Sequence, residues 1–414
     1  EMVKSVNDAA SDTCPRLGWW RWLFLGVFVF GGASVWGHPD GGYPRLLGMN
    51  IGAKNYGDAT YQPQLARLDA VILGFYPGWG QGTGSNPIRQ VVQALKRINP
   101  KLLVGQYTIV TEAYERTGAK DADRDKTVVL DQQGWWLKTA DGRKVQWTDV
   151  YGAWDVNITE WTKPDGMRRR YPEWLADRDY KTYFLAVPEF DIWFFDGVSE
   201  RPYTKVADWT VDRVNDSNAD PRIAAAFRRG HAREWSRARS VSSRLTLMGN
   251  VDNDLSFTEY AGRLQGAFLE ALMGKPWSLE SWGGWDKMMA RYRGALKNVS
   301  SPRIVGFNIW GDPADYRLAR YGLTSCLLED AYFSFTDKVR GYSSVPWFDE
   351  YDVNLGKPTE VPQRIAWRDG VYRRLFEKGM ILVNPTGQTR TVDLPSGYRR
   401  IVGRQAAVPN YGQV

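Results

Sequence analysis

Histidine and cysteine are the residue types that this chain contains least. Only 2 of its 414 residues are histidine and only 2 are cysteine. His38 and His231 are far apart, and His231 lies in the basic run FRRGHARE, which is typical of a solvated helix face. A multi-histidine metal site and a histidine-based catalytic triad are therefore nearly excluded.

The two cysteines exclude further classes of site. Cys14 precedes an apolar segment, and Cys326 lies in an apolar run that resembles a helix. Neither a disulfide framework nor a catalytic thiolate is indicated. Any acid–base chemistry must then come from Asp, Glu or Tyr, and we expect neither a metal nor another cofactor.

Concentrated positive charge is also missing. The net charge of +7 is spread along the chain, and residues 168–170 form the one tight cluster of arginines. A nucleic-acid-binding protein usually gathers such charge into a stripe. We therefore expect no nucleic-acid partner, leave an acidic glycan open as a partner, and expect a monomer.

The sequence has one long apolar run, WLFLGVFVFGGASVWG, at 22–37. Lys4, Arg16 and Arg21 precede it, which is the charge order of a secretory signal. The run is somewhat long for a signal and short for a membrane-spanning helix, so an uncleaved anchor is the alternative. We assign 1–37 to a signal peptide or N-terminal anchor and expect the rest to be secreted, periplasmic or on the cell surface.

Aromatic residues are abundant, with 20 Trp and 21 Tyr. Flat aromatic faces can hold sugar rings or bases by stacking, although core packing can absorb about half of them. A long insertion at about 108–166 is rich in them: Trp135, Trp136, Trp147, Tyr151, Trp154 and Trp161. Its run GWWLKTADGRKVQW predicts a hairpin, and a loop of this length is usually functional.

Eight times the chain repeats an apolar strand followed by a polar or aromatic tip, and helical stretches separate most of these strands. The predicted strands are RLLGMNIG, AVILGFYPGW, KLLVGQYTIV, DIWFFDGV, RLTLMGN, RLQGAFLEAL, RIVGFNIWGD and AYFSFTD. Eight such units are what a closed barrel requires. The predicted fold class is α/β, with a (β/α)8 TIM barrel over 38–342.

The pattern changes after Tyr342. VYRRLFEKGMILVNP, TRTVDLP and YRRIVG alternate over short stretches, with turn residues at Asn384-Pro385 and at 395–397. This alternating pattern, bounded by turn residues, predicts antiparallel strands. We assign 343–414 to a linker and a small C-terminal antiparallel β domain.

Two carboxylates follow predicted barrel strands. Asp196 ends the fourth strand in DIWFFDGVSE, and Glu270 follows Gly-Ala-Phe-Leu in the sixth. Active sites of such barrels lie at the C-terminal ends of the strands, and glycosidic cleavage usually needs a carboxylate pair. The alternative for Asp196 is that it caps the following segment or holds a loop.

Other strand tips carry residues that can stack on a sugar or bind its hydroxyl groups. An aromatic residue taken alone more often serves core or loop packing than binding, but the shared location at strand ends favours a binding role. The predicted substrate-binding residues are Asn50, Tyr76, Trp79, Gln106, Tyr107, Trp154, Asp155, Glu200, Asn250, Asp252, Asn308 and Trp310.

Several motifs resemble a known family. GWWLKTADGRKVQW, WDVNITEW, FFDGV, GAFLEAL and DAYFSFTD followed by PWFDEYDVNLGKP are similar to motifs of the bacterial hypothetical glycosyl hydrolase 15 family, and more distantly of polygalactosaminidase-type glycosidases. The resemblance covers roughly 45–385 and implies a TIM-barrel glycosidase, with Asp196 and Glu270 matching the carboxylates of strands four and six. Relatives more often carry Asp or Asn where this chain has 199–201, Ser-Glu-Arg, so Glu200 is a reserve candidate for the acid.

These observations predict an exported glycoside hydrolase that acts on a polysaccharide or oligosaccharide. Asp196 is the expected nucleophile or base, and Glu270 is the expected general acid. Two alternatives stay open at this point. One is a non-catalytic glycan-binding or scaffold protein, and the other is a transglycosylase that uses the same carboxylate pair.

Overall fold

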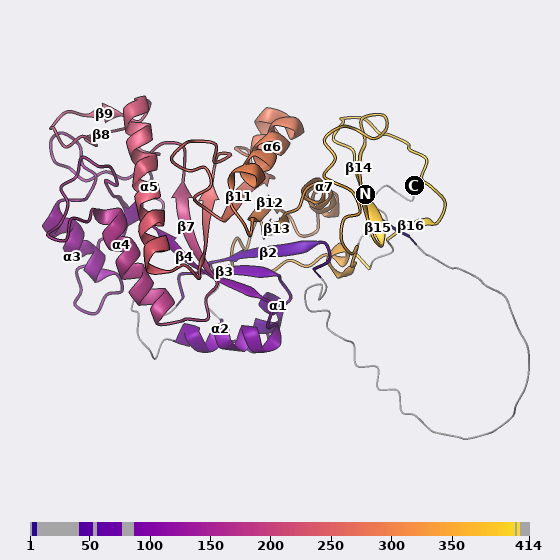
Figure 1. Cartoon of the computed structure of the whole chain (residues 1–414), viewed down its shortest axis with the longest axis horizontal. Helices are drawn as coiled ribbons and strands as arrows, with labels where there is room; N and C mark the ends of the chain where they lie inside the picture. The colour runs from indigo at the N-terminus through magenta and orange to yellow at the C-terminus, as the bar shows by residue number, and fades with distance from the viewer. Residues whose placement is uncertain (1, 6–40, 53–55, 77–86, 402–403, 406–414) are drawn as a thin grey trace, which may run out of the picture.

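Eight parallel strands form a closed barrel in the computed structural model, which describes residues 2–5, 41–52, 56–76, 87–401 and 404–405 (Figure 1). The barrel order is β10-β11-β12-β13-β2-β3-β4-β7. In chain order the strands are β2 (Arg45–Asn50), β3 (Ala70–Leu73), β4 (Leu103–Ile109), β7 (Ile192–Val198), β10 (Thr246–Val251), β11 (Gly266–Met273), β12 (Ile304–Gly311) and β13 (Tyr332–Asp337). The predicted (β/α)8 barrel and its eight strands are confirmed.

The barrel strands are almost continuously apolar because both of their faces are covered. Alternate residues such as Ile72, Phe194 and Phe268 pack inside the barrel. Their neighbours, such as Val71 and Phe195, pack outward in the larger core cluster. The last strand closes the ring on the first, with Tyr332 opposite Arg45.

Helices surround the barrel. They are α1 (Gln62–Ala66), α2 (Pro87–Ile98), α4 (Tyr171–Asp179), α5 (Pro221–Val241), α6 (Leu279–Asn298) and α7 (Tyr316–Leu327). α4 continues as the π-helix Tyr180–Leu185, and a short 3-10 helix, Asp349–Asp352, follows the barrel.

One prediction about α5 is wrong. His231 does not face solvent, since its exposed fraction is 0%. Its ring lies 4.9 Å from that of Phe227, one turn earlier, and 5.8 Å from that of Trp235, one turn later. The arginines around His231 flank this buried stripe, so the basic run FRRGHARE is part of an amphipathic helix and not of a fully solvated one. Burial lowers the pKa of His231 to about 3.

The insertion between β4 and β7 is folded. It contains a two-stranded ribbon of β5 (Glu112–Ala113) and β6 (Trp154–Asp155). It also contains the helix α3 (Arg124–Gln133), which the sequence did not predict. Where a hairpin was predicted, a turn is closed by a bridge between Lys138 and Lys144. Trp135 and Trp136 are buried in a core cluster that the insertion shares with Tyr171 of α4 and Phe227 of α5. Some of the aromatic residues are therefore packing residues.

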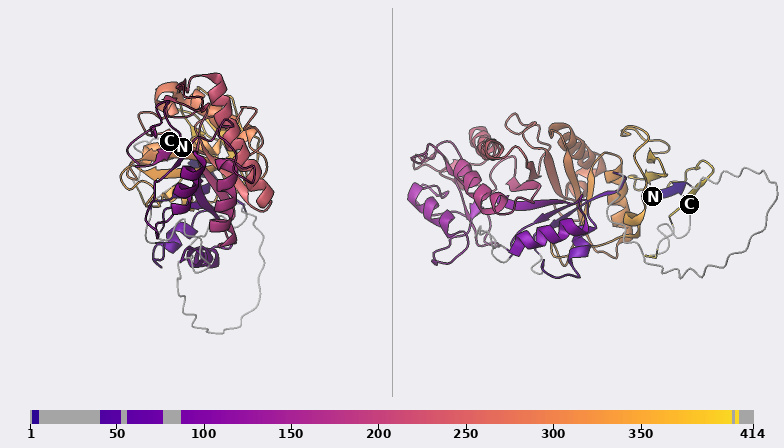
Figure 2. Two further views of the ribbon diagram at one scale, coloured as in Figure 1. Left: turned by 90° about the vertical axis from the view of Figure 1, so that its left-hand side faces the viewer. Right: turned by 60° about the horizontal axis from the view of Figure 1, so that its bottom comes forward.

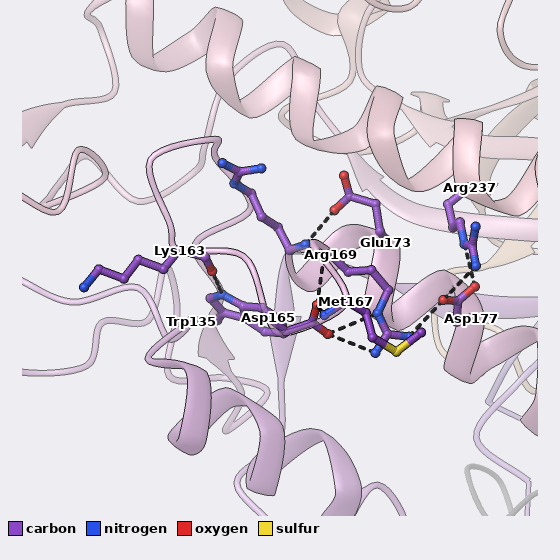
Figure 3. A network of polar contacts seen from close by, with 9 residues as sticks. Trp135, Lys163, Asp165, Met167, Arg169, Glu173, Asp177 and Arg237 are labelled. Carbon is purple, nitrogen blue, oxygen red and sulfur yellow. Dashed lines mark hydrogen bonds and ion pairs between the residues drawn. The ribbon is translucent and has the colours of Figure 1, made fainter.

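An ionic network ties the end of the insertion to two helices (Figure 3). Arg169 contacts Asp165 at 2.9 Å and Asp177 of α4 at 3.0 Å. Arg237 of α5 reaches the same Asp177 at 2.6 Å. These ion pairs thus anchor the C-terminal end of the insertion to α4 and α5.

A four-stranded antiparallel sheet contains β14 (Tyr372–Phe376), β15 (Gly379–Val383) and β16 (Tyr398–Arg400). The strand between β15 and β16 is β1 (Met2–Ser5), whereas the predicted strand TRTVDLP has no regular structure. Figures 1 and 2 show the sheet beside α7, at the opposite end of the molecule from the insertion. The small antiparallel β unit is confirmed, and its exact domain boundaries stay a prediction.

The apolar run at 22–37 lies outside the described residues. Of the helices in the described segments, none combines the length and apolar character needed to cross a bilayer. A pair of short strands, β8 (Val206–Ala207) and β9 (Asp216–Ser217), follows β7 and completes the elements.

Candidate active site

Asp196 lies near the C-terminal end of β7. The four preceding residues, Ile192 to Phe195, are buried, whereas Asp196 is partly exposed. Gly197 follows with a φ of +68°, and a Cβ atom at that position would lie 2.9 Å from Thr111 Oγ1. Glycine is therefore required both by the backbone conformation and by the close approach of Thr111, and this turn fixes the direction of the Asp196 side chain.

Glu270 lies at an irregularity in β11. The register between β11 and β12 shifts between Leu269 and Met273, and Ala271 has a φ of +48°. Asn308 on β12 stabilises this conformation, because its Oδ1 accepts a 2.9 Å hydrogen bond from the Ala271 amide. Irregularities of this kind re-aim side chains next to active sites, and here the side chain is Glu270.

Asn250 joins the two carboxylates. It lies on β10, between β7 and β11, where the register with β7 also shifts. Its Nδ2 donates to Asp196 Oδ1 and to Glu270 Oε2, each at 2.9 Å. The two acceptor oxygens therefore cannot lie farther apart than twice that distance. The sequence-predicted pair meets at one place in the barrel mouth.

Two tyrosines hold the outer oxygens of the pair. Tyr107 donates its hydroxyl hydrogen to Asp196 Oδ2, and Tyr342 donates to Glu270 Oε1. Burial, followed by the charge of the neighbouring carboxylate, raises the pKa of both phenols well above the usual value. Both tyrosines therefore remain protonated donors.

The surroundings of Glu270 favour its protonated form. Burial raises the pKa of this carboxyl group, and the charge of Asp196 adds to the effect. Hydrogen bonds from Tyr342 and Asn250 and the charge of Lys275 oppose it, but the net shift is upward. A carboxyl group that keeps its proton beside a second carboxylate is suited to general acid catalysis.

A cavity of about 320 Å³ adjoins Glu270. Its lining includes Glu200, Asp252, Trp277 and Arg291. This volume is within the range of small-molecule sites. Among the described residues, no group of three or more His, Cys, Asp or Glu side chains is arranged to hold a metal ion.

Four predicted substrate ligands are buried in the protein instead. Asn50, Tyr76, Gln106 and Asn308 are between 0% and 4% exposed. Asn50 Oδ1 accepts a hydrogen bond from Tyr61, Tyr76 donates to Gln106 at 2.6 Å, and Asn308 holds the β11 backbone. Their position at strand ends is as predicted, but their polar groups bond to the protein, which corrects the prediction that they bind sugar hydroxyl groups.

The remaining predicted ligands have varied positions. Trp154 packs in the core of the insertion, and Asp155 is buried within the insertion. Trp310 is half-buried, with the Lys275 ammonium 3.8 Å from its ring centre. Trp79 lies outside the described residues.

Sequence reasoning missed several residues around the carboxylates. Tyr342 follows β13 by a few residues, and Glu112 follows β4 in the same way. Both could have been found by inspecting the polar residues just beyond every predicted strand. Trp147, Tyr151 and Tyr203 are exposed; the density of aromatic residues in the insertion was a signal for the first two, whereas Tyr203 lies in the loop after β7.

Among solved structures, the chain is similar to the glycoside hydrolase domain of PelA from Pseudomonas aeruginosa, with 14% identity and a TM-score of 0.42 over 71% of this chain and 95% of that one. It is similar to a cycloalternan-degrading enzyme from Trueperella pyogenes, with 10% identity and a TM-score of 0.46 over 72% and 43% of the two chains. An Anoxybacillus alpha-amylase gives 11% identity and a TM-score of 0.45 over 85% and 89%.

A comparison with curated proteins found no match. The family model of hypothetical glycosyl hydrolase family 15 matches residues 96–380, which is more than half of the chain and includes Asp196 and Glu270. The protein therefore belongs to hypothetical glycosyl hydrolase family 15 and is a glycoside hydrolase.

Proposed function

We propose that this protein cleaves glycosidic bonds in an oligosaccharide or polysaccharide, with Asp196 as nucleophile and Glu270 as general acid. The observation that carries the proposal is the bridge from the Asn250 amide to both carboxylates. It brings two acidic groups together at the barrel mouth. Their surroundings differ, since burial raises the pKa of Glu270 and favours its role as the proton donor.

The proposed reaction has two steps. In the first, Glu270 transfers its proton to the glycosidic oxygen while an Asp196 oxygen attacks the anomeric carbon, so the leaving sugar departs as an alcohol. In the second, the Glu270 carboxylate takes a proton from water, whose oxygen attacks the same carbon and releases Asp196. Tyr107 and Asn250 hold Asp196 in place throughout.

The proposed stereochemical outcome is retention. Carboxyl groups of retaining glycosidases are ~5 to 5.5 Å apart, and those of inverting enzymes are ~6.5 to 9.5 Å apart. The shared Asn250 donor, 2.9 Å from one oxygen of Asp196 and one of Glu270, keeps these two oxygens within twice that distance, which supports the shorter class. Proton NMR of the anomeric signals in freshly formed product measures this directly, and an inverted product would contradict the nucleophile role.

Substitution of each carboxylate tests the assignment. We expect the rate constant kcat to fall by ~10²-fold or more in Asp196→Asn and in Glu270→Gln, because each substitution removes a group that acts in the transition state. This rate is measured as the release of reducing ends from a panel of glycans. Asp286→Asn, at an exposed carboxylate on α6, is the control that should leave the rate unchanged. Full activity of both site variants would exclude the pair.

Export and a monomeric state belong to the same proposal. The support for export is the charge and apolar pattern of 1–37. Expression of the full chain in a bacterial host, followed by fractionation and N-terminal sequencing, would distinguish a cleaved signal from a retained anchor. Recovery of the whole chain in the cytoplasm would contradict export.

A further inference from the structure

Exposed aromatic side chains gather on loops that follow barrel strands. Across the described residues, most Trp, Tyr and Phe side chains are at least half-buried. Those that are exposed follow β4, β7 and β11: Trp147, Tyr151, Tyr203 and Trp277 lie in loops, and Trp282 lies in the first turn of α6. Large apolar surface is costly to leave in water, so such a gathering indicates a binding surface.

Three of these side chains contact one another. The ring of Trp147 lies 5.8 Å from that of Tyr151 and 5.1 Å from that of Tyr203. We call these three residues the aromatic platform. Trp147 and Tyr151 come from the insertion, whereas Tyr203 comes from the loop after β7, so the platform joins two separate segments.

The platform adjoins the carboxylate pair. Burial raises the pKa of Tyr151, and the charges of Glu270 and Asp196 add to this shift. Burial raises the pKa of Tyr203, and the charge of Asp252 and then those of Asp196 and Glu270 add to this shift. The geometry agrees, because Thr111, which precedes Glu112, closely approaches Gly197, which follows Asp196.

Two carboxylates of the β5–β6 ribbon hold the platform. Glu112 lies opposite Asp155 in the ribbon, and directly opposite residues project from the same face. Glu112 Oε2 accepts a 2.7 Å hydrogen bond from Trp147 Nε1, and Asp155 Oδ1 accepts one of 3.2 Å from the Trp147 amide. The other oxygen of Asp155 accepts a hydrogen bond from Thr204, the neighbour of Tyr203. The ribbon therefore fixes both segments of the platform.

We propose that the aromatic platform is a stacking subsite for one ring of the sugar chain, and that Glu112 is a positioning residue that holds Trp147 in this subsite. The inference rests on the proposed function, since it requires a glycan substrate. A flat indole fixed by a hydrogen bond at its edge offers its face at little further cost in conformational entropy.

The hydrogen bond at Glu112 should depend on pH. Burial raises the pKa of Glu112 to about 7, the charges of Asp196 and Asp155 add to the shift, and the Trp147 indole opposes it. The other titratable groups affected by its charge are the phenols Tyr107, Tyr114 and Tyr151, which stay neutral in this range. An ionised carboxylate is the stronger acceptor, so Trp147 is held most firmly above about pH 7.

The hold on Trp147 can be measured without a ligand. In the full chain labelled with 15N-tryptophan, the Trp147 indole resonance is assigned by its loss in Trp147→Phe. We expect it to titrate with a midpoint near pH 7 and to lose that titration in Glu112→Gln. A resonance unaffected by pH and by Glu112→Ala would overturn the positioning role.

Kinetics and binding test the subsite itself. The probes are maltohexaose, cellohexaose, N-acetylchitohexaose and its deacetylated form. For each that wild type cleaves, Trp147→Ala and Glu112→Ala should raise KM about five- to tenfold with kcat unchanged. Glu112→Gln keeps an acceptor oxygen and should stay within about twofold of wild type. Glu115→Ala is the matched control, because this nearby carboxylate pairs with Lys144 instead.

Two outcomes would overturn the subsite. One is a loss of kcat in Glu112→Gln by ~10²-fold, the size expected for a proton donor. The other is wild-type affinity in Trp147→Ala, or no binding of any probe by wild type, in calorimetric titrations. Failure of the proposed function looks different, since Asp196→Asn would then cleave at the normal rate while the effect of Trp147→Ala on affinity could still be measured.

Discussion

Each of the two proposed catalytic carboxylates is held at its outer oxygen by a tyrosine. Tyr342→Phe removes the donor to Glu270, and that hydrogen bond favours the ionised form. Its loss should raise the pKa of Glu270 further, so the general acid would keep its proton to higher pH. We expect the alkaline limb of the kcat/KM profile to move to higher pH.

The measurement is the pH dependence of glycan hydrolysis for the Tyr342→Phe variant and wild type. Tyr316→Phe, on α7, is a matched control whose ring packs on Phe348, away from the carboxylates. An unchanged limb for Tyr342→Phe would show that Glu270 is not the group that titrates in the rate profile.

Single residues differ in how far the sequence could predict them. Asp196 and Glu270 follow apolar strands, and that pattern was sufficient to place them at the mouth. Asn250 and Asn308 occupy equivalent positions, yet Asn250 bridges the carboxylates and Asn308 supports the backbone of β11. The shifts of register at β10 and β11 decide this difference, and local sequence carries no signal for them.

At the scale of elements, α5 carries a buried acid. Glu234 is 0% exposed, and neither of its carboxyl oxygens has a hydrogen-bond partner among the described residues. Burial raises its pKa well above the usual value, and the charge of Asp179 adds to the shift while Lys126 opposes it. In the unfolded chain the same group ionises near ~4.3.

The stability of the protein should therefore change with pH through Glu234. Because the folded-state pKa is raised, its favourable contribution is complete below the unfolded value and is lost as pH rises toward the folded one. Glu234→Gln removes the ionisation, so we expect little difference from wild type at pH 4 and a gain of about 1 to 4 kcal/mol at pH 8. Urea unfolding at both pH values measures it, and an equal effect at both would contradict a charge-based cause.

Elements with a strong apolar period were predictable, and others were not. α5 and α7 bury regular stripes, whereas α3 has the sequence RDKTVVLDQQ and buries Lys126 and Thr127 together with Leu130. α3 is helical because the insertion packs around it, and its sequence has no apolar period from which the helix could be predicted. β1 was unpredictable for a similar reason, since its partners β15 and β16 are near the other end of the chain.

At the scale of the whole molecule, one buried arginine joins the C-terminal sheet to the barrel. Arg374 of β14 is 1% exposed, and its guanidinium donates to Asp330 at 2.6 Å and to the Leu327 carbonyl at 3.2 Å. Leu327 is the last residue of α7, and Asp330 lies between α7 and β13. Phe376 and Ile381 of the sheet belong to the same core cluster as the barrel helices.

Removal of this link should weaken the whole protein. We expect Arg374→Ala to lower the free energy of unfolding by about 1 to 3 kcal/mol, because the buried Leu327 carbonyl loses its partner and the packing of a buried side chain is lost. Wild type should unfold in one transition when followed by both fluorescence and circular dichroism. Arg390→Ala, at an exposed position in the same unit, is the control. Two separate transitions in wild type would show that the sheet is independent of the barrel.

The seam of the barrel also sets an order of events during biosynthesis. β2 has no neighbour on one side until β13 reaches it, and Tyr342, which completes the hydrogen bonds of Glu270, follows β13. On the ribosome, the first strand must therefore wait with an open edge until the other seven barrel strands have been translated. The ring cannot close before that, and so the nascent protein can acquire its proposed catalytic acid in final form only once the last barrel strand and Tyr342 have been made.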